Sequence, residues 1–191
     1  MNADGSGRHR LVPGGFPVWS PDGSKIGYAA PSFPSSIAVM NADGSGKHRV
    51  PHTTDGCEYP SWSPDWTRVV FNCNSSGEHL MYIVDVDGSR LVDLSGVGEG
   101  WQVDWSPDGR SILFASSRDH EPGWTDIYVM RPDGSEVTRL TYDLGYTPAW
   151  SPDGRYIVFS AGGLFVMRSD GSGITSLPVD GVGETGFPDW V

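Results

Sequence analysis

The chain has little positive charge, only two cysteines and no long apolar run. It carries 13 Lys and Arg against 24 Asp and Glu, which gives a formal net charge of −11. An acidic surface repels DNA, RNA and anionic lipid, because binding to any of them needs a basic patch. No apolar stretch approaches the roughly 20 residues of a membrane-spanning helix, and no secretory signal peptide is visible at the start. We therefore expect neither nucleic-acid binding nor a membrane span.

Recognisable catalytic motifs are missing as well. The sequence contains no G-x-S-x-G nucleophile elbow and no α/β segment that would carry one. It has no phosphate-binding glycine loop and no Ser-His-Asp order of a hydrolase. These absences favour a non-enzymatic protein without a cofactor.

The most informative feature that is present is a repeat. Trp-Ser-Pro-Asp begins at four tryptophans, and a shortened Pro-Asp-Trp near the C-terminus adds a fifth: Trp19, Trp62, Trp105, Trp150 and Trp190. Successive tryptophans are 43, 43, 45 and 40 residues apart. Asp-Gly-Ser follows the same period, at Asp4, Asp43, Asp87, Asp133 and Asp170. A fixed period in the forties indicates a repeat architecture.

The last full repeat shows how each unit is built. Strands are expected at 147–151, 155–160, 164–167 and 174–177, because β-branched and aromatic residues favour strands. Ser-Pro-Asp-Gly and Asp-Gly-Ser-Gly between them are tight-turn sequences, with Gly at the left-handed position. Four antiparallel strands in about 40–45 residues make one blade of a β-propeller. We expect the repeated Trp to pack between neighbouring blades, where its large area is buried.

The whole chain, residues 1–191, is predicted to be a single all-β propeller of four-stranded antiparallel blades. Four complete blades are expected at about 14–50, 57–94, 100–141 and 146–177, with terminal strands of an incomplete fifth at 8–12 and 186–191. Because Met1–Gly7 is repeated identically at Met40–Gly46, we expect a piece of a longer chain. Open strand edges favour pairing, which predicts a homo-oligomer joined through the blade edges. Imperfect closure of four blades is the alternative.

The repeats resemble a known family. The Trp-Ser-Pro-Asp-Gly turns, the Ile-x-Phe strands and the segment Ile-Tyr-Val-Met-x-x-Asp-Gly-Ser are similar to the repeats of the TolB-type, WD-repeat-like β-propeller family, over nearly the whole chain. The resemblance implies a bacterial, periplasmic or secreted module that binds a protein or peptide. Similar repeats form propellers of prolyl-oligopeptidase-type peptidases and of polysaccharide lyases. The propeller portion of a larger hydrolase or lyase is therefore the alternative, since fold does not imply function.

Antiparallel alternation separates the loops onto two faces. The first-to-second and third-to-fourth strand turns, which contain the regular Asp-Gly sequences, share one face. The irregular loops share the other face, which is the expected binding surface because loops that differ on a repeating scaffold carry function. Acidic and aromatic residues of this irregular face suit a protein or peptide partner: Asp55, Glu58, Glu78, Glu99, Trp101, Asp119, Trp124, Tyr142 and Tyr146.

Two metal hypotheses follow from the same loops. His52, His79 and His120 come from different irregular loops and are candidate ligands of a divalent metal. The Asp-Gly-Ser turns lack the spacing of a calcium loop, so turn formation explains them. A divalent cation held in the central channel by carboxylates or carbonyls stays open as an alternative.

The two cysteines suggest a disulfide. If Ser63 pairs with Thr67 across a three-residue hairpin, Cys57 and Cys73 face each other, with Cα atoms about 5.5 Å apart. We expect a disulfide, with two free thiols as the alternative, and a bridge would indicate an oxidising compartment. Nearby, Trp66 replaces the Gly of the other Ser-Pro-Asp turns, which predicts a different turn type or a strained backbone.

Overall fold

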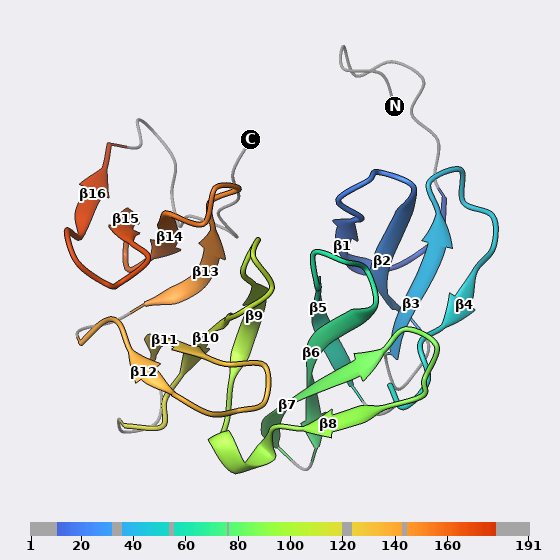
Figure 1. The fold of residues 1–191 in the computed structure, drawn as a ribbon, viewed down its shortest axis with the longest axis horizontal. Coiled ribbons are helices and arrows are strands. Elements are labelled where there is room, and N and C mark those ends of the chain that lie inside the picture. Colours follow the sequence, from blue (N-terminus) through green and yellow to red (C-terminus); the bar gives the residue numbers. More distant parts are fainter. Residues whose placement is uncertain are drawn as a thin grey trace.

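A computed structural model describes residues 11–31, 36–53, 56–75, 77–119, 124–142 and 145–178. These residues form sixteen strands in four antiparallel four-stranded sheets, each a blade (Figure 1). Blade 1 contains β1 (Gly15–Trp19), β2 (Lys25–Ala30), β3 (Ser36–Asn41) and β4 (His48–Arg49). Blade 2 contains β5 (Cys57–Trp62), β6 (Arg68–Ser75), β7 (Glu78–Asp85) and β8 (Leu91–Asp93). Blade 3 contains β9 (Trp101–Trp105), β10 (Ile112–Ser116), β11 (Asp126–Met130) and β12 (Thr138–Arg139). Blade 4 contains β13 (Tyr146–Trp150), β14 (Tyr156–Ser160), β15 (Leu164–Arg168) and β16 (Thr175–Leu177).

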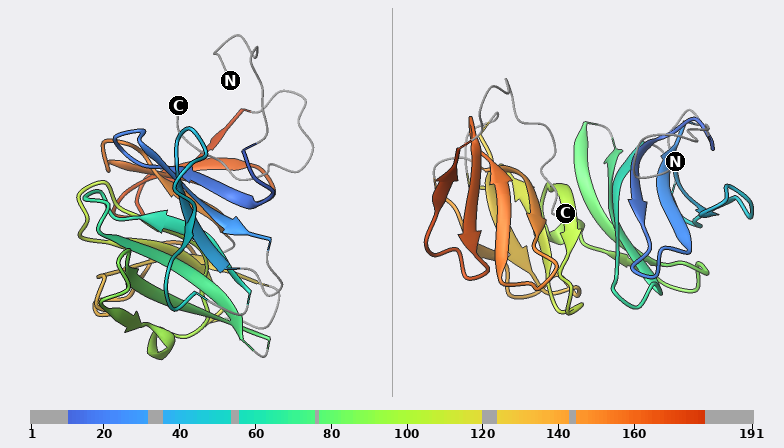
Figure 2. Two further views of the ribbon diagram at one scale, coloured as in Figure 1. Left: turned by 90° about the vertical axis from the view of Figure 1, so that its right-hand side faces the viewer. Right: turned by 90° about the horizontal axis from the view of Figure 1, so that it is seen from above.

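The blades stand side by side around a common centre. The first strand of each blade is innermost, and the strands follow outward in chain order (Figure 1). β5 packs against β1 and β9, and β9 packs against β13, but β1 and β13 share no comparable contact. The two end blades stand apart as the ends of an open arc (Figure 2). The prediction of an all-β propeller with four complete blades is confirmed. In the described ranges, no helix is long and apolar enough to span a membrane.

The turns within the blades are held by their aspartates. In the Ser-Pro-Asp turn of blade 1, Asp22 accepts hydrogen bonds from the backbone N–H and hydroxyl of Ser24, at 3.0 and 2.8 Å. Gly23 next to it takes the left-handed conformation, with φ of 69°. In the Asp-Gly-Ser turn of the same blade, Asp43 accepts from the backbone N–H of Ser45 at 2.8 Å. The carboxylates are thus engaged in turn formation, as Asx-type turns require.

These turns predict a loss of stability in acid. Serine hydrogen bonds lower the pKa of Asp22 to about 2 and lower the pKa of seven further turn carboxyls: Asp43, Asp65, Asp87, Asp108, Asp133, Asp153 and Asp170. Because the folded pKa lies below the unfolded one, the contribution is complete above about pH 4 and is lost as the pH falls toward 2. The urea midpoint should therefore decrease between pH 5 and pH 2.

A matched variant checks the cause. Asparagine at Asp43, Asp87, Asp133 and Asp170 keeps an acceptor oxygen in each Asp-Gly-Ser turn but removes four titrating carboxyls. This variant should lose less stability than the unmodified chain over the same pH range. An equal acid loss in both proteins would contradict the assignment to the turns.

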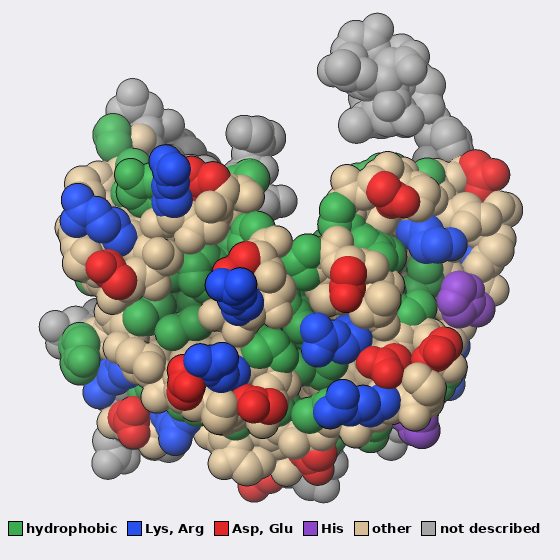
Figure 3. Space-filling model, viewed as in Figure 1, with side chains coloured by type: hydrophobic (Ala, Val, Ile, Leu, Met, Phe, Trp, Pro, Cys, Tyr) green, Lys and Arg blue, Asp and Glu red, His purple; other side chains and the backbone are tan. Residues whose placement is uncertain are grey.

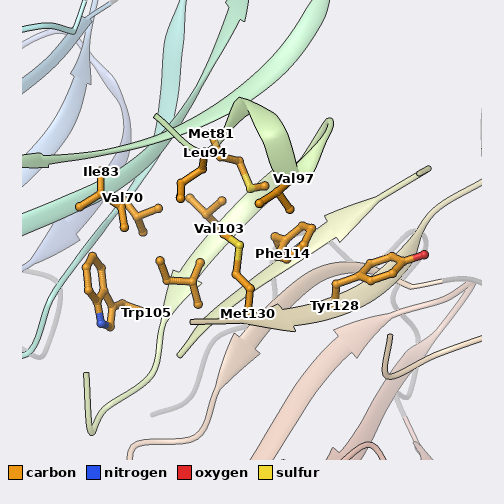
Figure 4. Packing of buried hydrophobic residues seen from close by; sticks show 11 residues of the cluster. Val70, Met81, Ile83, Leu94, Val97, Val103, Trp105, Phe114, Tyr128 and Met130 are labelled. Atoms are coloured by element: carbon orange, nitrogen blue, oxygen red, sulfur yellow. The ribbon is translucent and has the colours of Figure 1, made fainter. Parts of the chain in front are cut away.

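The hydrophobic core lies mainly between blades rather than within them. The largest cluster joins Val70, Met81 and Ile83 of blade 2 to residues of blade 3 such as Phe114 and Met130. Figure 4 shows these side chains, with Trp105, converging from the facing blades. Separate clusters join blade 1 to blade 2 and blade 3 to blade 4. Each junction between neighbours is therefore a core of its own.

The repeated Trp packs on the preceding blade. Trp62 covers Gly27 of blade 1 so closely that a Cβ there would lie 2.3 Å from the indole Nε1. Trp105 is buried against blade 2, and Trp150 packs into the cluster formed with blade 3. Trp19 has no preceding blade among the described residues, and 58% of it is exposed. The expectation of packing between blades is therefore wrong for Trp19, because its receiving surface is missing from the described residues.

A second contact repeats at the outer edge of each junction. The Asp-Gly-Ser turn glycine of one blade lies against the end of the preceding outer strand: Gly134 against Leu94, and Gly171 against Leu140. Gly44 of blade 1 lies against Leu11 in the same way. Terminal strands were expected at 8–12 and 186–191. Residues 8–10 and the whole of 186–191, which includes Trp190, lie outside the described residues. Residues 11 and 12 are not in a strand, although Leu11 occupies the position of an outer-strand end.

Blade 2 differs from the predicted register of its first hairpin. The backbone N–H of Ser63 donates to the carbonyl of Arg68, so the predicted pairing of Ser63 with Thr67 is wrong by one residue. The connection between β6 and β7 is short, because β6 continues to Ser75 and β7 begins at Glu78. Trp66 keeps the left-handed conformation of the glycines that it replaces, with φ of 60°. Its ring stacks on Trp62 with centroids 4.2 Å apart, which offsets part of the backbone strain.

Candidate binding site at the centre of the propeller

Every innermost strand contains a bulge at the same place. The residue three positions before each repeated Trp has a positive φ, between 48° and 54°: Phe16, Tyr59, Gln102 and Thr147. The strand register shifts at each of these residues. A bulge leaves one residue without a partner in the ladder and re-aims its side chain. Four non-glycine residues in this costly conformation surround the centre of the propeller, and such strain is common at functional sites.

Proline follows the bulge residue in three of the four blades. Pro17, Pro60 and Pro148 occupy this position, and Val103 replaces them in blade 3. Proline lacks the N–H of a ladder hydrogen bond, so it is tolerated at bulges and on edge strands. The innermost strand is an edge strand of its blade. The sequence therefore folds locally into a bulged edge that faces the centre.

The innermost strands line an open central channel. Its cavity has a volume of about 250 Å³ and is lined by residues of β1, β5, β9 and β13, including Phe16, Tyr59 and Pro148. The rings of Phe16 and Tyr59 lie against each other, with centroids 4.1 Å apart. Figure 3 shows hydrophobic side chains in the centre and along the notch between the two ends of the arc. The channel wall is thus mostly apolar.

A chain of hydrogen bonds ties three blades together beside this channel. Ser61 of blade 2 accepts from the backbone N–H of Trp105 and donates to Asp104, both at 3.0 Å. The other carboxylate oxygen of Asp104 accepts from the backbone N–H of Trp150 at 2.8 Å. Gln102 likewise accepts from the backbone N–H of Thr147 at 2.8 Å. These polar groups therefore hold the blades in register.

A second pocket opens at the irregular end of the channel. Its volume is about 300 Å³, and its lining includes three aromatic residues from three blades: Tyr59, Trp101 and Tyr146. Trp101 and Tyr146 are the first residues of β9 and β13, and all three rings are half-buried. His79 lies behind Trp101, with ring centroids 5.4 Å apart. We call this cavity the mouth pocket; the rest of its lining is Gln102, Ala115, Ser117 and Thr125.

The expected binding-face residues divide into two groups. Trp101 and Tyr146 meet in the mouth pocket, and Glu58, half-buried, precedes Tyr59 at its side. Glu78 and Glu99 belong to the same face, but their side chains do not line the pocket. Asp55 lies outside the described residues. Tyr59 and Gln102 were not among the expected binding-face residues. The recurring Pro-x-Trp that follows Tyr59 was a usable signal for Tyr59, whereas Val103 follows Gln102.

The other binding-face residues belong to the loops of blade 3 and do not line the mouth pocket. Asp119 accepts a hydrogen bond from the hydroxyl of Tyr128 at 2.8 Å, so it has an intramolecular role. Burial, together with this hydrogen bond, raises the pKa of Tyr128. Trp124 and Tyr142 are 53% and 67% exposed, and the guanidinium of Arg139 lies over the Tyr142 ring at 4.7 Å. Blade 3 therefore adds exposed aromatic surface beside the pocket.

Arg139 also joins a buried carboxylate. Asp126 at the start of β11 is fully buried, and it accepts from the guanidinium of Arg139 and from the hydroxyl of Thr141. Thr141 in turn accepts from the backbone N–H of Ile127 at 2.9 Å. Buried charges need such partners, because desolvation costs several kcal/mol per ion. This group fixes the base of the irregular loops of blade 3.

The three-histidine metal hypothesis stays a prediction. His120 lies outside the described residues. His52 is exposed and contacts the carbonyl oxygen of Gly88 at 3.3 Å, while His79 lies beside Trp101. Within the described ranges, no three His, Cys, Asp or Glu side chains form a group that could hold a metal ion.

Cys57 and Cys73 are opposite each other and joined by a disulfide. Their Cα atoms are 3.9 Å apart, closer than the expected 5.5 Å. The backbone N–H of Asn74 donates to the carbonyl of Gly56, so Gly56 and Asn74 form the hydrogen-bonded pair next to the cysteines. Cysteines at the adjacent non-hydrogen-bonded pair lie closer together.

The bridge gives a direct prediction. Protein purified under oxidising conditions should contain no free thiol by mass spectrometry after alkylation. Reduction should lower the free energy of unfolding by about 3 kcal/mol, because the bridge closes a loop across a sequence separation of 16 residues. A variant with alanine at both cysteines should be insensitive to reductant. Two free thiols in the oxidised preparation would contradict the bridge.

Four bladed sheets around a channel define a β-propeller. The model of the TolB β-propeller domain family matches residues 9–177. The chain therefore belongs to this family, which confirms the resemblance of its repeats.

Known structures and sequences agree with this assignment. A putative TolB from Agrobacterium tumefaciens is 26% identical, with a TM-score of 0.74 over 86% of this chain and 67% of that one. TolB from Acinetobacter baumannii has the same fold, with a TM-score of 0.77 and 21% identity over 92% of this chain. An uncharacterised protein of Agrobacterium fabrum, Atu1656, is 37% identical over 83 residues. The chain spans 47% of the Acinetobacter TolB and 27% of the Agrobacterium fabrum protein.

Proposed function

We propose that the chain is a non-enzymatic propeller scaffold that binds a peptide or an extended protein segment at its irregular face. The observation that carries this proposal is the mouth pocket, where Tyr59, Trp101 and Tyr146 converge from three blades. Partly exposed Tyr and Trp side chains are the residues most often enriched at protein-binding sites. The apolar central channel continues behind them, since Tyr59 and Gln102 line both cavities.

The polar groups near the channel support binding rather than chemistry. Ser61, Asp104 and Gln102 are engaged in hydrogen bonds between blades. A catalytic role would draw these groups into proton transfer and disturb the junctions that they hold. The net charge of −11 also favours a partner that is not strongly acidic.

Peptide selection tests the proposal. A displayed library of random peptides should yield binders to the immobilised chain, and Tyr146→Ser should weaken them at least about tenfold, since a central aromatic contact contributes about 1.4 kcal/mol or more. Tyr156→Ser is the matched control, because Tyr156 is an exposed tyrosine beside the Ser-Pro-Asp-Gly turn of blade 4, on the opposite face. Circular dichroism verifies that both variants are folded. No selected binder, or equal weakening by both variants, would overturn the proposal.

We also propose that the isolated chain self-associates through its exposed blade edge. The large apolar ring of Trp19 is exposed, whereas the equivalent rings of Trp62 and Trp105 are buried. Light scattering should show species larger than a monomer that decrease with dilution, and Trp19→Ser should shift them toward the monomer. A clean monomer at high concentration would contradict this proposal.

An oxidising compartment, periplasmic or extracellular, is proposed from the disulfide. A bridge of this kind persists where thiols are not kept reduced.

A further inference from the structure

The mouth pocket combines three aromatic rings with uncharged polar groups. Tyr59, Trp101 and Tyr146 come from β5, β9 and β13, and no Lys or Arg is among the described residues that line the pocket. Aromatic faces carry negative electrostatic potential, which attracts an ammonium or guanidinium group. We propose that the mouth pocket binds the cationic side chain of a basic residue, Arg or Lys, within the partner segment. This inference rests on the proposed peptide-binding function.

A carboxylate stands beside the rings. Glu58 holds in blade 2 the position that Trp101 and Tyr146 hold in blades 3 and 4, four residues before the repeated Trp. Glu58 is half-buried and directly precedes Tyr59 in β5, so its carboxylate is within electrostatic reach of that ring. In agreement, burial and the charge of Glu58 raise the pKa of the Tyr59 hydroxyl. Aromatic faces and a nearby anion act together on a cation, because each favours positive charge in a partly desolvated site.

Two other occupants fit less well. An acidic group would meet Glu58 and the field of a chain with net charge −11. A purely apolar group would fit the rings but would gain nothing from the carboxylate. The contrast with Tyr142 is useful, since that ring on the same face already has the guanidinium of Arg139 over it at 4.7 Å. The chain thus shows the same pairing of Arg and Tyr within its own surface.

The test uses two small probes of equal shape. N-acetyl-arginine amide carries a guanidinium, and N-acetyl-citrulline amide replaces it with a neutral urea. Titrated against the full chain and followed by NMR chemical shifts, the arginine probe should bind saturably and at least about fivefold more tightly than the citrulline probe, as expected for a desolvated cation–π contact. Equal binding of the two probes, or no saturable binding of the arginine probe, would overturn the inference.

Variants locate the binding. Tyr146→Leu should weaken the arginine probe about fivefold to tenfold, whereas Tyr146→Phe keeps the aromatic face and should stay within about twofold. Glu58→Gln should reduce the preference for arginine over citrulline. Tyr156→Leu, at an exposed tyrosine beside the Ser-Pro-Asp-Gly turn on the opposite face, is the control outside the pocket and should have no effect. Equal losses in Tyr146→Leu and Tyr146→Phe would overturn the role of the ring face.

The peptide selection separates this inference from the function on which it rests. Selected peptides enriched in Arg or Lys, and sensitive to Tyr146→Leu, would support both. Selected peptides without basic enrichment would leave peptide binding standing and overturn the cationic preference. Saturable arginine binding without any selected peptide would support the pocket chemistry and overturn the peptide-binding function.

Discussion

Replacing Trp105 with alanine should lower the free energy of unfolding by about 3–5 kcal/mol, the range typical of a buried Trp. The same substitution at Trp19 should lower it by less than about 1 kcal/mol, as expected for an exposed side chain. The two residues begin the same four-residue motif, but Trp105 is 4% exposed and Trp19 is 58% exposed. Trp105 fills the core between blades 2 and 3, with the guanidinium of Arg68 over its ring at 4.8 Å.

Urea denaturation followed by circular dichroism measures both effects. Trp62→Ala is the replicate, because Trp62 occupies the same position at the junction of blades 1 and 2. Losses of similar size for Trp19→Ala and Trp105→Ala would show that blade 1 also has a covered leading face. An unfolding transition with two steps would mean that blades unfold independently. The change in the free energy of unfolding is then taken from the first of the two steps.

Replacing Asp126 with alanine should destabilise the chain by about 3 kcal/mol, because it removes one partner of a buried ion pair. Asp126 is fully buried and accepts from Arg139 and Thr141, so its loss leaves two donors without this acceptor. Thermal unfolding should show a lower midpoint, and the irregular loops of blade 3 should become more sensitive to proteolysis. An unchanged midpoint would contradict a structural role for the pair.

A paired variant separates the charge from the packing. Asp126→Leu combined with Arg139→Met replaces the ion pair by apolar side chains, and such replacements are often neutral. The double variant should therefore be more stable than Asp126→Ala. This pair belongs to blade 3 alone among the repeats, since Ser36 and Leu80 hold the corresponding positions in blades 1 and 2.

The blades could be predicted from the sequence because their signals are local. Turn sequences such as Ser-Pro-Asp-Gly determine backbone conformation within a few residues, and the segments between them have strong strand propensity. The repeat then multiplies each local signal. The resemblance to the TolB-type propeller family predicts the same blades, because the turn and strand residues of each repeat also carry that resemblance.

The predicted pairing of Cys57 with Cys73 is correct, but only because two unpredicted features of the strand register cancel each other. The hairpin pairs Ser63 with Arg68 rather than Thr67, which alone would displace Cys57 from Cys73 by one residue. The bulge between Glu58 and Ser61 shifts the register back. A bulge depends on the approach of neighbouring strands at the centre, so the spacing of the turn alone could not reveal it.

The mouth pocket could be predicted only in part. Trp101 and Tyr146 were predicted because they follow directly on irregular loops that contain acidic and aromatic residues. Tyr59 and Gln102 correspond to Thr147, the first residue of the strand predicted at 147–151, so the pattern of irregular loops did not identify them. Their left-handed backbone re-aims them, and that conformation depends on tertiary packing rather than on their own propensity.

Because Trp62, Trp105 and Trp150 each pack on the blade before them, cooperativity along the arc passes only between neighbouring blades. Blades 2 and 3 are each held by two junctions, whereas blades 1 and 4 have one each among the described residues. In such a one-dimensional array, opening an end unit breaks a single interface. Amide hydrogens of the end blades should therefore exchange with solvent before those of β6 and β10, even though all four blades have the same antiparallel strand order.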